Sequence, residues 1–269
     1  MEHRTGHHSS ASIAGTDPAL LPVTGRPLDY AEGDTVFKGY VACPEGRRGP
    51  AATVLLCHDW SGLNRSMMGV ADRLAGLGYV CVALDLYGKG VRGDEAGDNA
   101  ALMGPLMADR ALLRRRLLAG KEAAFGAAEV DASRVAVMGY CFGGLCALDL
   151  ARTGTADVKG AISVHGGFAP PGLGPQPPIM AKVLILHGWE DPIAPPEGLF
   201  ALAAELTGAQ ADWQVHAYGH AMHAFTAASL DFPERGIRYD ANADRRSWAA
   251  VRLFLAEVIG APTGGEGRG

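Results

Sequence analysis

Short hydrophobic runs alternate with longer amphipathic stretches along most of this 269-residue chain. The runs are nearly continuous in apolar residues, which is typical of strands buried on both faces of a sheet. Strands are predicted at Thr35–Ala42, Ala52–Cys57, Tyr79–Leu84, Arg134–Met138, Gly160–Val164, Val183–His187 and Gln214–Tyr218.

The stretches between these runs have apolar residues at helical spacing. Helices are predicted over roughly Met67–Leu77, Pro105–Ala128, Phe142–Arg152, Pro196–Leu206 and Ala241–Ile259. The last helix has a clear apolar face, and the long middle helix has a similar stripe at Leu106, Leu113, Leu117 and Ala124. Strands that alternate with helices predict an α/β fold with a mainly parallel central sheet and helices on both faces.

The two ends of the chain lack this pattern. Residues 1–25 are rich in Ser, His, Gly and Thr without periodicity, so we predict an N-terminal tail, a single domain over residues 26–260 and a C-terminal tail over 261–269. The histidines at 3, 7 and 8 are interpreted as part of that tail rather than as a metal site. The N-terminus also lacks the apolar core of a secretory signal.

Two long connections follow predicted strands, at residues 87–104 and 165–180. The first is rich in glycine and the second in proline. Both should lie at the carboxyl edge of the sheet, where open α/β sheets bind ligands. Neither is long enough to form a separate lid domain.

Composition narrows the classes of function. Hydrophobic residues make up 48% of the chain, charged residues 20%, and the net charge is −5, as in an ordinary soluble protein without a basic surface for nucleic acid. No apolar run reaches the roughly 18 residues of a membrane span. The five cysteines form no C-x-x-C pair, which favours a reducing, cytoplasmic location. Without a heptad or an interface stripe, we expect a monomer or a weak homodimer.

A candidate nucleophile lies in the run from Val135 to Gly144, which reads as a buried strand, a tight turn and the start of a helix. This arrangement is typical of the nucleophile elbow of G-x-S-x-G hydrolases, with glycines where side chains would collide with the neighbouring strand and helix. Cys141 takes the place of the serine. A buried cysteine beside ordinary turn glycines is the plainer alternative.

A thiol nucleophile needs a base, and the base needs a carboxylate to orient it. In α/β-hydrolases the chain order is nucleophile, acid, histidine. Asp191 and His223 follow predicted strands in that order, each in a loop. Glu190 is a weaker alternative acid, and His220 is the main alternative base, ahead of His187 and His165.

The spacing of His216, His220 and His223 also suggests a metal site. No carboxylate or cysteine nearby in the sequence completes the ligand set, so we expect no metal there.

The early loop His58–Asn64 supplies the remaining candidates. An oxyanion hole takes one backbone N–H from the residue after the nucleophile and one from such a loop, here Phe142 and Trp60. Asp59 is either a simple turn residue or a carboxylate within reach of the thiol.

Five segments together resemble the dienelactone hydrolase family: His58–Asn64, Asp85–Tyr87, Gly139–Gly144, His187–Asp191 and His223–Phe225. The resemblance runs from about residue 28 to residue 258. It implies an α/β-hydrolase fold without cofactor, a Cys141–His223–Asp191 triad, and a role for Asp59 in holding and activating the thiol.

The chain departs from the family pattern in three places. The early-loop carboxylate of the family is usually Glu, so Asp59 is shorter by one methylene. The two arginines that grip the carboxylate of dienelactone align with Lys89 and Ala227, which weakens one contact and removes the other.

The sequence therefore predicts a hydrolase that cleaves small-molecule lactones or small esters through a thioester. Tyr87, Lys89, Trp189 and Phe225 are predicted to contact the substrate. The alternatives are a non-catalytic ligand-binding protein of the same fold and a thiol sensor that uses Cys141 and Cys146.

Overall fold

The structure, a computed structural model, describes residues 19–262. His3, His7 and His8, with the rest of residues 1–18 and 263–269, lie outside the described residues. The predicted boundary at residue 25 is wrong, because strand β1 (Val23–Glu32) already pairs with β2 (Thr35–Pro44) from Val23 onward. Gly33, with φ of 55°, lies in the turn between them.

An eight-stranded sheet forms the centre of the molecule, in the order β1-β2-β4-β3-β5-β6-β7-β8. β1, β2 and β4 pair antiparallel, whereas all pairs from β4 to β8 are parallel. The further strands are β3 (Ala51–Cys57), β4 (Val80–Leu84), β5 (Val130–Tyr140), β6 (Val158–Val164), β7 (Lys182–Gly188) and β8 (Trp213–Tyr218). All seven predicted strands are confirmed within a few residues, and β1 was missed.

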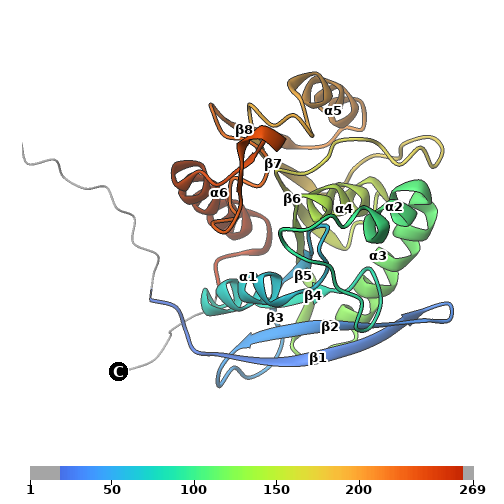
Figure 1. The fold of residues 1–269 in the computed structure, drawn as a ribbon. Helices are drawn as coiled ribbons and strands as arrows, with labels where there is room; N and C mark the ends of the chain where they lie inside the picture. Colours follow the sequence, from blue (N-terminus) through green and yellow to red (C-terminus); the bar gives the residue numbers. More distant parts are fainter. Residues whose placement is uncertain (1–18, 263–269) are drawn as a thin grey trace, which may run out of the picture.

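Helices cover both faces of this sheet (Figure 1). α1 (Arg65–Gly76) and α6 (Ala241–Ile259) pack on one face. The other face is covered by α2 (Ala100–Ala108), α3 (Arg110–Phe125), α4 (Phe142–Arg152) and α5 (Pro196–Gly208). The predicted α/β class and the absence of a large lid domain are confirmed for the described residues.

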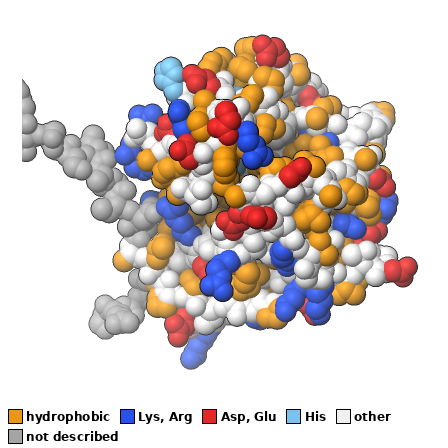
Figure 2. Space-filling view, viewed as in Figure 1, with side chains coloured by type: hydrophobic (Ala, Val, Ile, Leu, Met, Phe, Trp, Pro, Cys, Tyr) orange, Lys and Arg blue, Asp and Glu red, His pale blue; other side chains and the backbone are white. Residues whose placement is uncertain are grey.

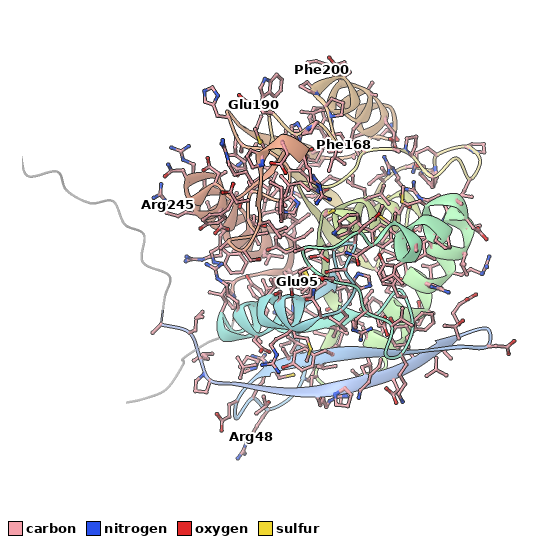
Figure 3. All side chains as sticks on the ribbon, viewed as in Figure 1. Arg48, Glu95, Phe168, Glu190, Phe200 and Arg245 are labelled. Atoms are coloured by element: carbon pink, nitrogen blue, oxygen red, sulfur yellow. The ribbon has the colours of Figure 1, made fainter. Side chains whose placement is uncertain are left out.

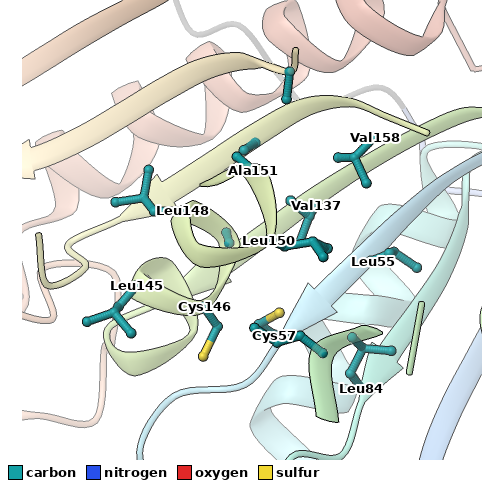
Figure 4. Close-up of a cluster of buried hydrophobic side chains, with 14 of the residues drawn as sticks. Leu55, Cys57, Leu84, Val137, Leu145, Cys146, Leu148, Leu150, Ala151 and Val158 are labelled. Carbon is teal, nitrogen blue, oxygen red and sulfur yellow. The ribbon is translucent and has the colours of Figure 1, made fainter. Parts of the chain in front are cut away.

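Alternate side chains of the central strands divide the core in two. In β3, Leu55 and Cys57 contact the α4 side, while Val54 and Leu56 contact the α1 and α6 side. Figure 4 shows part of the first cluster, which joins Cys146 and Leu150 of α4 to Leu55, Cys57 and Val137 of the sheet. Cys57 and Cys146 are fully buried there, and burial raises the pKa of both thiols, that of Cys57 to about 12.

The predicted helix Pro105–Ala128 is wrong as a single element. It is two helices, α2 and α3, which meet at Asp109. The Asp109 carboxylate accepts a hydrogen bond from Leu112 N at 2.8 Å and so caps α3. The apolar stripe runs through the break without interruption, which explains why it concealed the boundary.

The connections at the carboxyl edge of the sheet position the candidate site. The connection from β6 to β7 contains no helix, and we call residues 165–180 the Pro-rich segment. After β8, two short paired strands, β9 (Asp231–Phe232) and β10 (Ile237–Arg238), flank the helical turn Pro233–Arg235. Among the described residues, no helix is long and apolar enough to cross a membrane.

Candidate active site

Cys141 lies at the apex of the sharp turn between β5 and α4. Its backbone has φ of 54° and ψ of −117°, a conformation that a residue with a side chain rarely adopts. The turn is possible because two glycines allow close approach. A Cβ on Gly139 would lie 2.0 Å from Gly143 O, and one on Gly143 would lie 2.2 Å from Cys57 O.

The turn brings Cys141 beside the predicted base. Its Sγ lies 3.1 Å from His223 Nε2, and His223 Nδ1 lies 2.7 Å from Asp191 Oδ2. His223 and Asp191 are 3% and 1% exposed, so both groups are removed from solvent. The structure thus brings together three residues that lie far apart in the sequence.

The backbone fixes both partners of Cys141. Asp191 Oδ1 accepts hydrogen bonds from Ile193 N at 2.8 Å and Ala194 N at 3.2 Å, which leaves Oδ2 for the histidine. The backbone of His223 donates to Gly236 O and accepts from Arg238 N, next to β10. The short β9–β10 hairpin therefore holds the imidazole in place.

The charges of the three groups favour an ionised histidine. Burial alone would lower the pKa of His223, but the neighbouring Cys141 sulfur and the Asp191 carboxylate outweigh it and raise this pKa to about 10. Burial alone would raise the pKa of Asp191. Its hydrogen bond to His223 and the charge of that histidine outweigh burial, so the pKa of Asp191 lies below its usual value. The arrangement therefore favours the protonated form of His223.

His165, at the end of β6, packs edge-on against His223 with ring centroids 5.2 Å apart. Its Nε2 lies 2.9 Å from Thr226 Oγ1. Burial and the nearby His223 charge lower the pKa of His165 to about 3, so this ring stays neutral. It is not placed to act as the base of Cys141.

The alternative acid and base pair with each other instead. His220 Nδ1 lies 2.8 Å from Glu190 Oε1, and the His220 side chain is 90% exposed. His216 is exposed on β8. The described residues contain no group of three or more His, Cys, Asp or Glu side chains that could hold a metal ion.

The early loop after β3 is tied to the start of α1. The Asp59 carboxylate accepts hydrogen bonds from both the N–H and the hydroxyl of Ser61, and Asn64 Nδ2 donates to that hydroxyl at 2.8 Å. Asn64 in turn caps α1 through Met67 N. Asp59 lines the same cleft as Cys141, but its hydrogen bonds are to Ser61, so its action on the thiol stays a prediction.

The residues predicted to supply the oxyanion donors, Trp60 and Phe142, line the same cleft as Cys141. Phe142 is the first residue of α4, so its N–H has no acceptor within the helix. The carbonyl of Trp60 accepts from the Tyr87 hydroxyl at 2.9 Å, which anchors the early loop. Both N–H groups remain candidates for the oxyanion hole.

Four predicted substrate contacts are not among the residues that line the cleft, and their contact with substrate stays a prediction. Tyr87 is buried against His58 and Phe142, and Phe225 is fully buried against His165 and Tyr218. Trp189 packs beside His187 and is 43% exposed. Lys89 forms an exposed ion pair with Asp29 at 3.1 Å. A position just after a strand places a residue at the carboxyl edge of the sheet, but it does not determine the direction of the side chain.

The cleft above Cys141 has a volume of about 1350 Å³. Its walls come from α1, α2, α4, α5, the Pro-rich segment and the loop 223–237. Figure 2 shows hydrophobic side chains gathered around a hollow on this face, and Figure 3 labels Phe168 and Glu95, which both line the cleft. No motif connects these segments, so sequence reasoning missed most of the lining.

A buried ionic network below the cleft was also missed. Arg152, only 1% exposed, donates to both Glu205 oxygens at 2.7 and 2.8 Å and to Phe168 O at 2.9 Å. Arg110 donates to both Asp149 oxygens and to Ala169 O. The network fixes the start of the Pro-rich segment against α3, α4 and α5. In the sequence, the only signal of this network was a charged residue, Arg152, at the end of an apolar helix.

Comparison with known proteins gives a consistent result. The sequence pattern of the dienelactone hydrolase family matches residues 37–259. A putative carboxymethylenebutenolidase from Saccharolobus solfataricus is 26% identical over 271 residues, covering 87% of this chain and 98% of the relative. An uncharacterized protein from Caenorhabditis elegans is 33% identical over 149 residues, which cover 55% of this chain and 94% of that protein.

Solved structures resemble the whole described domain. A dienelactone hydrolase-like promiscuous phosphotriesterase from metagenomic libraries is 37% identical, with a TM-score of 0.82 over 88% of this chain and 99% of that one. A putative dienelactone hydrolase from Klebsiella pneumoniae, 22% identical with a TM-score of 0.73, covers 88% of this chain and 99% of its own and shares the fold.

Proposed function

Because this chain belongs to the dienelactone hydrolase family and is a hydrolase of ester bonds, we propose that it opens lactones or cleaves small carboxylic esters with a Cys141–His223–Asp191 triad. The reaction passes through a thioester on Cys141. The observation that carries this proposal is the continuous hydrogen-bonded line from sulfur to imidazole to carboxylate, at 3.1 and 2.7 Å.

The first half of the reaction forms the thioester. The proton of the Cys141 thiol passes to His223 Nε2, and the sulfur attacks the substrate carbonyl. The negative oxygen that develops is held by the N–H groups of Phe142 and Trp60. The tetrahedral intermediate collapses by breaking the carbon–oxygen bond, and His223 gives its proton to the departing oxygen.

The second half releases the acid. His223 takes a proton from water, and the resulting hydroxide attacks the thioester carbonyl. The carbon–sulfur bond breaks, and the proton returns from His223 to the Cys141 sulfur. Asp191 orients His223 and stabilises its charged form in both halves. These steps use only side chains and water, in keeping with our expectation that no cofactor is needed.

The two positions that grip a substrate carboxylate in the family place no arginine in this cleft. Lys89, aligned with one arginine of the family, pairs with Asp29 outside the cleft, and Ala227, aligned with the other, contributes only a methyl group to the lining. A carboxylate removed from water needs a compensating charge-assisted hydrogen bond. We therefore expect neutral lactones and esters to be better substrates than dienelactone.

Burst kinetics with p-nitrophenyl acetate test this mechanism. We expect one equivalent of nitrophenol in the burst, an acyl mass increase on Cys141, and a loss of about 10³-fold or more in Cys141→Ala. Cys146→Ala, which removes a buried thiol on the same helix, is the matched control and should keep the burst. Turnover by Cys141→Ala at the native rate would disprove the thiol mechanism.

The alternative is a ligand-binding protein without catalysis. It predicts saturable binding of esters with neither burst nor adduct. A phosphotriester belongs in the same screen, because the 37% identical relative is described as a promiscuous phosphotriesterase. The cytoplasmic location and the monomer or weak homodimer remain predictions, which fractionation and light scattering would test.

A further inference from the structure

The cleft extends in two directions from Cys141. One arm passes between α1 and the loop 223–237, with Met67, Val70, Leu230 and Phe232 in its walls. The other arm, which we call the α4–α5 arm, runs along α4 and is lined at its end nearest Cys141 by Leu145. Cys141 and His223 lie between the two arms.

The proton route assigns a different part of the substrate to each arm. His223 must hand its proton to the departing oxygen, so the leaving group lies on the side of the loop that carries His223. The acyl group then extends away from that loop, into the α4–α5 arm.

This arm is long and mainly apolar. From α4, Phe142 and Leu145 line it near Cys141, and Arg152, the last residue of the helix, lines it farther away. Met103 and Met107 of α2 line one side, one helical turn apart. One face of α5 lines another side, with Gly198, Ala201, Leu202 and Glu205, and Pro195 lies just before this helix.

The charged groups of this arm are mostly neutralised by one another. Arg152 and Glu205 form an ion pair at 2.7 Å at its far end. Arg114, half-buried on α3, is the remaining charged residue of the arm among the residues that the structure describes. The part nearest Cys141 therefore presents hydrocarbon and sulfur surface, from Leu145, Phe168 and the two methionines of α2.

We propose that the α4–α5 arm binds a long, unbranched aliphatic acyl chain, so that the preferred substrates are medium-chain esters rather than small ones. This inference rests on the proposed function and names the substrate class of the same site. Each methylene that the acyl chain buries there adds favourable transfer from water.

A series of p-nitrophenyl esters from acetate to octanoate, kept below micelle formation, measures this preference. We expect kcat/KM to rise with acyl length, by at least about 30-fold from acetate to octanoate, because the added methylenes leave water. A second series lengthens the alcohol of acetate esters, from ethyl to octyl. It reports on the other arm and serves as an internal comparison.

Gly198→Leu tests which arm holds the chain. A Cβ at Gly198 would meet only Phe168 Cδ2, at 3.4 Å, so a larger side chain can extend into the arm without a backbone clash. We expect the octanoate-to-acetate ratio of kcat/KM to fall by about tenfold or more, while the ratio within the alcohol series keeps its native value. Gly208→Leu, at the other end of α5 with nothing within 4 Å of a Cβ, should leave every ratio unchanged.

A second pair of variants keeps the test decisive if Gly198→Leu does not fold. Met107→Glu places a charge in the arm and should lower the octanoate ratio in the same way, whereas Ala108→Glu, exposed on the same helix, should not. A flat acyl series in an enzyme that still shows the Cys141 burst would overturn this inference and leave the proposed function standing. So would a steep series that neither Gly198→Leu nor Met107→Glu alters. Absence of the burst with every ester would instead count against the proposed function.

Discussion

The elbow at Cys141 and the Pro-rich segment both follow a strand at the same edge of the sheet, but they are held in different ways. At the elbow, backbone packs on backbone: Cys141 N donates to Val164 O at 3.0 Å, and Gly143 lies directly against Cys57. Between Phe168 and Pro178, no backbone-to-backbone hydrogen bond is formed within these described residues. Side chains hold that segment, namely Arg110 and Arg152 at its start and Gln176 near its end.

Because of this difference, the position of the Cys141 sulfur and the shape of the cleft wall depend on separate sets of contacts. The Cys141 sulfur is placed by backbone contacts that leave no room for a side chain at Gly139 or Gly143, so its position depends little on the rest of the surface. The Pro-rich segment is held by a few side-chain hydrogen bonds, and most of its residues are exposed. A change in the Pro-rich segment can alter what is bound without moving what reacts.

Loss of the base should have the largest effect on the elbow. We expect His223→Ala to reduce kcat/KM for p-nitrophenyl acetate by about 10³-fold or more, because Cys141 loses the imidazole that is proposed to take its proton. His220→Ala, which removes an exposed histidine paired with Glu190, is the matched control and should stay near the native rate. Equal losses in both variants would contradict the assignment of the base.

Loss of the anchor should act on the Pro-rich segment. Arg152→Ala removes a guanidinium that is 1% exposed and leaves Glu205 without its ion pair, so we expect a loss of about 3 kcal/mol in the free energy of unfolding by urea. Limited proteolysis should cut the segment faster than in the native protein. Arg134→Ala, which breaks a half-exposed pair with Asp131, should cost about 0.5 kcal/mol. A similar small cost for Arg152 would show that the segment is held by something else.

The lowered pKa values of two buried histidines, His165 and His187, predict how the free energy of unfolding depends on pH. Burial lowers the pKa of His187, and burial with the charge of His223 lowers that of His165 to about 3. Below pH 6.5 the unfolded chain binds protons at these residues that the folded chain does not, so the free energy of unfolding should fall as pH drops from 6.5 towards 3.

His187→Phe tests this sign. His187 is fully buried, and neither ring nitrogen has a hydrogen-bond partner among the described residues. The variant should flatten the slope below pH 6.5 by up to about 1.4 kcal/mol per pH unit, the contribution of one proton. His216→Gln, at an exposed position on β8, should not change the slope. An unchanged slope in His187→Phe would mean that His187 takes up its proton in the folded state.

The smallest effect is expected at Lys89. Its ion pair with Asp29 has side chains that are 51% and 55% exposed, and such pairs contribute little. Lys89→Ala should change the free energy of unfolding by less than about 0.5 kcal/mol and kcat/KM for neutral esters by less than about twofold. A large loss of activity would support Lys89 as a substrate contact.

The sequence was informative where a local pattern has one structural solution. Cys141 between Gly139 and Gly143 could be placed because only glycines fit the contacts with α4 and β3. Asp191 and His223 could be placed because their strands are continuous apolar runs, and the carboxyl ends of parallel strands meet at one edge. The two contacts, from Cys141 to His223 and from His223 to Asp191, agree with the predicted chain order of nucleophile, acid and histidine.

The remaining features depend on long-range packing that leaves little local signal. β1 was missed because it lies at the edge of the sheet, mostly exposed, and pairs only with β2. The aromatic residues Tyr87 and Phe225 were assigned to the substrate, but a strand-end position does not determine which way a side chain turns. The α4–α5 arm could not be predicted, because α2, α4, α5 and the Pro-rich segment each contribute a few residues that form no sequence motif.

The looseness of the Pro-rich segment has a consequence for how this domain can diversify. Gly172 and Gly174 are exposed, and nothing lies within 4 Å of a Cβ built on either. Extra residues inserted between them would add little closure entropy and would displace no packed neighbour. Insertions and deletions here could thus lengthen or shorten the α4–α5 arm. By this route, descendants of this chain could acquire new substrates and keep the same reaction.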